Sequence, residues 1–148
     1  MSLLDRIRLG TYAADLAAAG PDSLPGRGAS LVDVAVRVSE GEDVLQAVRD
    51  FLDQVNRRSE GELAELIGAR PGPTGDQKAD ALLAGVAEHL AAVRGLRCPA
   101  WVREPERFLD SFWFVSHVPG FRATALAQTP MALKRRGIFW PARSLERV

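Results

Sequence analysis

Residues 42–57 carry apolar side chains at a spacing that only a helix gathers onto one face. These side chains recur after one, three or four residues, so they form a single stripe on a helix of 3.6 residues per turn. The stripe consists of Val44, Leu45, Val48, Phe51, Leu52 and Val55. Because a helix with one apolar face must cover that face, the chain needs other elements that share a core with this helix.

Several other segments show the same helical period, and most carry capping signals. We predict helices over residues 3–19, 31–38, 59–67 and 77–94. Ser59 and Glu62 have the spacing of a capping box, in which each side chain bonds the other residue's backbone amide. Asp76 is placed to cap the helix over 77–94, and Gly95 is placed to end it.

The composition changes after Leu96. All three Trp and five of the six Phe lie beyond this residue, with prolines at positions 99, 105, 119, 130 and 141. These prolines exclude one long helix, so we expect short helices over 105–112, 120–128 and 131–136. The pair Thr129-Pro130 has the composition of an N-cap and first helical position. Residues 138–140 read as a short extended segment, and Ser144 as the cap of a last turn.

Few segments alternate apolar and polar residues for long enough to build a sheet. We therefore predict an all-α fold, a compact multi-helix domain with short C-terminal helices and at most a minor strand. The glycine- and proline-rich stretch 68–75 is the best internal boundary. It divides an N-terminal helical lobe, 1–70, from an aromatic-rich C-terminal lobe, 71–148, unless the two form one continuous domain.

The net charge of the 148 residues is zero, but the charges are unevenly distributed. Residues 1–93 contain 9 Lys and Arg against 15 Asp and Glu, whereas residues 94–148 contain 10 against 4. Two interpretations remain open: the halves attract each other within the fold, or the basic half binds an acidic partner.

The cysteine content and the distribution of apolar residues indicate a cytoplasmic protein. The single cysteine, Cys98, excludes an internal disulfide and the usual multi-cysteine metal sites. Charged residues at positions 5, 6 and 8 interrupt the apolar start, unlike a signal peptide, and no apolar run is long enough to span a membrane.

We find no arrangement of residues typical of catalysis, metal binding or a cofactor. His89 lacks a second ligand at helical spacing, and the side chains of the neighbours Ser116 and His117 diverge. Glycine motifs for phosphate binding are absent. An enzyme would need a pocket that holds His117 or an acidic pair. We expect no catalytic residue, no bound metal and no cofactor.

The residue types favour a binding protein instead. Large aromatic residues and arginines anchor protein interfaces. The candidate contacts are Asp50, Asp53, Trp101, Trp113, Arg135, Arg136 and Trp140. The alternative is a nucleic-acid-binding regulator, in which Lys134, Arg135 and Arg136 contact the backbone beside Phe139 and Trp140. Neither hypothesis fixes the oligomeric state.

Residues 71–148 also carry a distinctive series of short motifs. The series is Thr74-Gly75-Asp76, Asp80-Ala81-Leu82-Leu83, Ala87-Glu88-His89-Leu90-Ala91, Pro99-Ala100-Trp101, Phe108-Leu109-Asp110, Trp113-Phe114-Val115, Arg135-Arg136-Gly137-Ile138-Phe139 and Leu145-Glu146-Arg147-Val148. It resembles an actinobacterial domain associated with helix-turn-helix regulators and similar to the antitoxin partners of nucleotidyltransferase-like toxins.

The resemblance implies a protein that binds and neutralises a cognate toxin by protein–protein contact, without catalysis. An acidic helix face over 42–55 would suit a toxin whose own groove is basic. The chain departs from the fused form of such proteins, because no helix-turn-helix precedes the domain.

Overall fold

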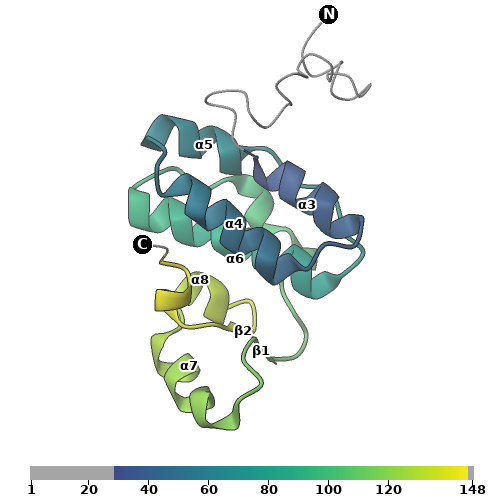
Figure 1. The fold of residues 1–148 in the computed structure, drawn as a ribbon, viewed down its shortest axis with the longest axis vertical. Coiled ribbons are helices and arrows are strands. Elements are labelled where there is room, and N and C mark those ends of the chain that lie inside the picture. The colour runs from purple at the N-terminus through teal and green to yellow at the C-terminus, as the bar shows by residue number, and fades with distance from the viewer. Residues whose placement is uncertain (1–28, 147–148) are drawn as a thin grey trace, which may run out of the picture.

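The computed structural model describes residues 29–146, and these form a mostly α-helical structure with a minor sheet (Figure 1). The α-helices are α3 (Leu31–Ser39), α4 (Val44–Val55), α5 (Glu60–Gly68), α6 (Gln77–Arg94), α7 (Arg122–Gln128) and α8 (Met131–Lys134). Single 3-10 turns cover Ala100–Arg103, Pro105–Arg107, Pro119–Phe121 and Ala142–Ser144. The sheet pairs β1 (Trp113–Phe114) with β2 (Ile138–Phe139) in parallel. The helix expected over residues 3–19 lies outside the described residues.

The capping signals in the sequence fix where the N-terminal helices begin. Ser59 and Glu62 make both hydrogen bonds of the capping box at α5. The side chain of Asp76 accepts a hydrogen bond from the amide of Lys78, so α6 begins at the predicted residue. This helix ends at Gly95, whose left-handed backbone (φ 67°) is the conformation that favours glycine.

Helix α6 is the central element. It contacts α3 and α5 as well as α8 and the turns Ala100–Arg103 and Pro105–Arg107. Its residues 81–87 are all buried, so the middle of this helix lacks the exposed polar face of an ordinary surface helix. In Figure 1, α3, α4 and α5 gather toward one end of the molecule, and α7, α8 and the two strands lie toward the other.

A single hydrophobic core runs through the described residues, from Leu31 in α3 to Leu145 near the C-terminus. Its members come from both sides of the stretch 68–75, and the indole nitrogen of Trp101 donates a hydrogen bond across that stretch to the carbonyl of Ile67. The predicted lobes therefore share one core.

The proline-rich region differs from the sequence prediction in two places. The expected helix over 105–112 is only a single turn, Pro105–Arg107, because the chain is extended from Phe108. Thr129 does not cap α8; its hydroxyl donates a hydrogen bond back to the carbonyl of Ala125, in the preceding helix (2.6 Å). Helix α8 also ends at Lys134, two residues earlier than expected.

No helix in the described part of the chain combines the length and the apolar character needed to cross a membrane.

Candidate functional site: a cavity lined by arginines and aromatic rings

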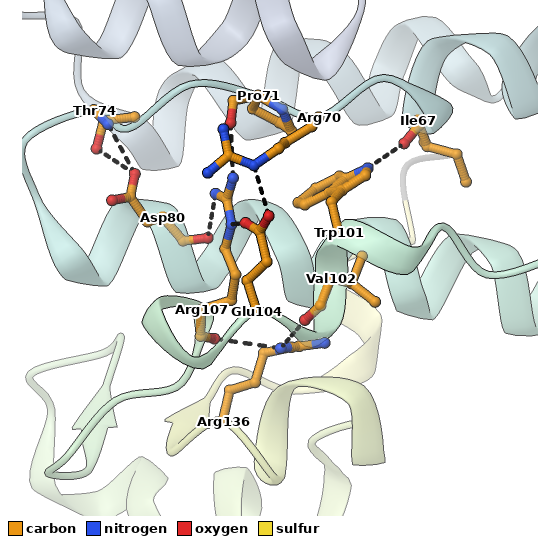
Figure 2. Close-up of polar contacts among 10 residues, drawn as sticks. All are labelled: Ile67, Arg70, Pro71, Thr74, Asp80, Trp101, Val102, Glu104, Arg107 and Arg136. Carbon is orange, nitrogen blue, oxygen red and sulfur yellow. Dashed lines mark hydrogen bonds and ion pairs between the residues drawn. The ribbon is translucent and has the colours of Figure 1, made fainter.

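The buried arginines of the C-terminal half stabilise turns inside the molecule (Figure 2). The guanidinium of Arg107 donates hydrogen bonds to the carbonyls of Pro71 (2.7 Å) and Asp80 (3.2 Å). It also lies 4.8 Å from the centre of the Trp101 ring. Glu104 bonds both Arg107 and Arg70 through its carboxylate, and the bond from Arg70 is the main reason that the pKa of Glu104 is lowered.

Arg136 is the second such residue, and its side chain is 0% exposed. It donates hydrogen bonds to the carbonyls of Val102 (2.9 Å) and Arg107 (3.3 Å), and its guanidinium lies 4.4 Å from the centre of the Phe108 ring. It also pairs with Glu88 of α6. Burial lowers the pKa of Arg136, and the charge of Glu88 opposes that shift.

Two of the predicted partner contacts, Trp101 and Arg136, lie inside the described fold. Both are buried, and the polar groups of both bond backbone carbonyls within the fold. The physical reason is that short turns leave carbonyls without helical partners, and long side chains with several N–H groups satisfy them. Amphipathic residues that resemble interface anchors in the sequence are used here as internal supports.

The other predicted contact residues are placed differently. Arg135 is exposed but pairs with Glu88 (2.8 Å), which also holds Arg136. Trp113 is half-buried with the amine of Lys78 5.5 Å from its ring centre. Asp50 and Asp53 are exposed on α4, and Asp50 accepts a hydrogen bond from Gln46. Trp140 is mostly buried, yet it lines a cavity.

The cavity has a volume of about 420 Å³ and lies between α4, α7 and the segments at 114–116 and 139–144. We call it the arginine pocket. Its lining residues are Leu45, Arg49, Phe114, Val115, Ser116, Phe121, Arg122, Thr124, Ala125, Phe139, Trp140, Pro141, Arg143 and Ser144. This volume is within the range of sites that hold small molecules.

Aromatic rings form much of the wall, and guanidinium groups lie over two of them. Phe114 and Phe139 stack with ring centres 4.7 Å apart. The guanidinium of Arg122 lies 5.2 Å from the Phe114 ring centre, and that of Arg49 lies 5.9 Å from the Trp140 ring centre. Arginine stacks on aromatic faces in this way while its N–H groups stay free to bind an anion.

The lining contains three arginines and no Asp or Glu. Within the described part of the chain, no carboxylate lies at ion-pair distance from Arg49, Arg122 or Arg143. This distinguishes them from Arg135 and Arg136, whose charges Glu88 balances. Among the residues that the structure describes, the positive charge of the arginine pocket therefore has no paired carboxylate.

Residues 29–146 contain no cluster of three His, Cys, Asp or Glu side chains suited to a metal ion. His117 is exposed, and the hydroxyl of its neighbour Ser116 accepts a hydrogen bond from the amide of Val118 (3.2 Å). Ser116 lines the arginine pocket, as do Thr124 and Ser144.

Sequence reasoning placed Arg143 near Trp140 in the basic C-terminal cluster but did not bring Arg49 and Arg122 to the same site. Arg49 belongs to α4, Arg122 begins α7, and Arg143 belongs to the last 3-10 turn. Nothing in their local sequence distinguishes them from surface arginines, because only the packing of α7 and the C-terminal turn near α4 brings them together.

Comparison of the chain with protein families, with curated proteins and with solved structures gave no match.

Proposed function

We propose that this protein acts by binding another protein, as an antitoxin-like partner that neutralises a toxin of the nucleotidyltransferase-like kind. The observation that carries the proposal is the exposure of large apolar side chains in the C-terminal region. Phe112 is 74% exposed and Met131 is 68% exposed, while Phe121 and Leu126 are also exposed. Side chains of this size gain stability by leaving water, so several together in one region favour a surface that a partner covers.

Charge supports the same region. The exposed apolar residues lie in the same part of the chain as Arg122 and Arg143, which have no carboxylate partner in the described structure. Arginine with exposed aromatic rings is the composition of interface centres. The class of partner comes from the resemblance of residues 71–148 to antitoxin-like domains, and the binding surface is argued from the exposed residues.

The nucleic-acid alternative rests on Lys134, Arg135 and Arg136, and the structure gives that cluster little free charge. Arg136 is buried, and Glu88 pairs with both arginines. Since phosphate binding needs exposed, unpaired cations, we base no proposal on this cluster.

The test is copurification from the native host at moderate salt, comparing the tagged wild-type chain with a double variant, Phe112→Ser with Met131→Gln. We expect the wild type to retain one nucleotidyltransferase-like protein near stoichiometry, and the double variant to lose it at least tenfold. Val93→Ser is the matched control, since Val93 is 60% exposed on α6 and lies outside the C-terminal region. Coexpression should then relieve growth inhibition by that partner.

Recovery of the chain alone would overturn the proposal. Recovery of nucleic acid that is removed by salt would restore the regulator hypothesis instead. Equal retention by the double variant and the wild type would place the binding surface elsewhere on the molecule.

A further inference from the structure

We propose that the arginine pocket binds a small organic phosphate with a planar ring, of the size and chemistry of a nucleoside monophosphate. The site shares Phe121, Arg122 and Arg143 with the region proposed to bind a protein, but Phe112 and Met131, the residues changed in the test of that interface, do not line it. Three features of the pocket carry the inference: its charge, its aromatic wall and its volume.

The charge requires an anion. Arg49, Arg122 and Arg143 come from three different elements and converge on one cavity, with no acidic side chain in the lining. Arg49 is half-buried and Arg122 and Arg143 are exposed, so their like charges repel one another around a partly apolar cavity. A bound phosphate would relieve that repulsion, and the planar guanidinium matches a phosphate with two parallel hydrogen bonds.

The aromatic wall requires more than an inorganic ion. Phe114, Phe121, Phe139 and Trp140 make most of the lining apolar, and a fully hydrated ion would leave that surface uncovered. A flat ring can stack on an aromatic side chain or on the outer face of a guanidinium that already lies over one. Arg49 over Trp140 and Arg122 over Phe114 provide two such faces.

The volume of the cavity and the hydroxyl-bearing residues that line it restrict the class of ligand further. A cavity of about 420 Å³ accommodates a ring joined to a phosphate by a short polar linker, but leaves little room for a larger cofactor. Three residues with hydroxyl groups, Ser116, Thr124 and Ser144, line the same cavity. The Ser116 oxygen accepts a bond from the Val118 amide, so its own O–H is free to donate to such a linker.

The experiment is calorimetric titration of the purified full-length chain with adenosine monophosphate and uridine monophosphate, with adenosine and inorganic phosphate as separate probes. We expect one monophosphate to bind per chain, and to bind at least tenfold more tightly than either adenosine or phosphate alone. Trp140 lines the pocket, so binding should also change tryptophan fluorescence, and Trp140→Phe should remove most of that change.

Arg49→Gln and Arg122→Gln should each weaken monophosphate binding about tenfold or more, the effect of losing a hydrogen bond to a charged group. Arg103→Gln is the matched control: it removes the same charge at an exposed position outside the pocket and should leave affinity unchanged. Circular dichroism of each variant checks that α4 and α7 remain folded.

Three outcomes would overturn the inference. Absence of monophosphate binding by the folded wild type would exclude the ligand class. Equal affinity for inorganic phosphate would show a simple anion site without ring recognition. An equal loss in Arg103→Gln would show non-specific attraction to a basic surface. Because the protein-partner test uses residues outside the pocket, each proposal can fail without the other.

Discussion

Arg135 and Arg136 are adjacent in the chain and share one carboxylate, yet they occupy opposite environments. Arg135 is exposed, whereas Arg136 is buried and bonds two carbonyls in addition to Glu88. An exposed ion pair contributes little because water screens it. Loss of the buried Arg136 would leave the carbonyls of Val102 and Arg107 without the hydrogen bonds that it donates.

We predict that Arg136→Met lowers the free energy of unfolding by about 3 kcal/mol, the range for breaking a buried ion pair. Arg135→Met should lower it by less than about 1 kcal/mol. Urea denaturation measures both, and the two variants make the same chemical change against the same carboxylate. Equal losses would mean that Arg136 is not the internal support described here.

His89 couples stability to pH. The residue is half-buried in α6, and burial lowers the pKa of its imidazole below the ordinary value, while the charge of Glu146 opposes that shift. The unfolded chain therefore binds a proton more readily than the folded chain does. The stability linked to His89 is fully present above the unfolded pKa, about 6.5, and is lost as the pH falls toward the folded pKa.

We predict that the unfolding midpoint of the wild type decreases as the pH is lowered from 7 to 5. The substitution His89→Gln should make this decrease smaller. His117→Gln is the matched control, because His117 is exposed, and it should keep the wild-type profile. A profile unchanged by His89→Gln would assign the pH dependence to other groups.

At the scale of elements, the close approach of α6 to α8 depends on one glycine. A Cβ built at Gly85 would overlap Leu133 Cδ2 and lie 3.4 Å from Cδ of Arg136. Leu133 is fully buried, so its methyl group has no open space to enter. Alanine would favour the helix by about 1 kcal/mol, but the overlap opposes that gain.

We predict that Gly85→Ala lowers the free energy of unfolding in the wild-type background. In a Leu133→Ala background, where the obstructing methyl is gone, the same substitution should raise it. The coupling between the two sites in a double-mutant cycle should be about 1–2 kcal/mol. A coupling near zero would mean that the helices adjust without cost, and that Gly85 is not what sets their distance.

The elements also show how far sequence reasoning reaches. Ser59, Glu62, Asp76 and Gly95 act on their own neighbours in the chain, so their signals predicted the starts of α5 and α6 and the end of α6. Past Leu96 the elements are too short to be stable by local bonds alone, and tertiary contacts decide them. Thr129 is an example, since its hydroxyl bonds the preceding helix instead of capping the next one.

At the scale of the whole molecule, the uneven charge distribution is partly satisfied within the fold. Arg94, Arg135 and Arg136 of the basic half pair with Glu60 and Glu88 of the acidic half. Among the cations without a carboxylate partner in the described structure, Arg122 and Arg143 of the basic half and Arg49 of the acidic half lie around the pocket. The sequence shows that the charge is unevenly distributed, but it does not show which charged residues stay unpaired. That depends on contacts between segments that are distant in the sequence.

The shared core predicts how the molecule unfolds. Trp101 bonds the carbonyl of Ile67 and Arg94 bonds the carbonyl of Arg58, so contacts that cross the stretch 68–75 link the two predicted lobes. Both lobes bury apolar surface against α6. Unfolding of one lobe would therefore expose buried surface of the other. The chain should therefore unfold in one cooperative transition.

The three tryptophans make this testable without truncation, because all lie beyond Leu96 and report on the C-terminal half. Among the described helices, the longer ones α3 to α6 contribute most to far-UV circular dichroism, and α3 to α5 precede residue 70. We predict that tryptophan fluorescence and circular dichroism give coincident urea transitions, with the same midpoint and slope. Arg107→Met, which removes the bond to Pro71, should move both midpoints together. Two separated transitions would instead divide the molecule near residue 70, and would mean that contacts across the 68–75 stretch are too weak to couple its halves.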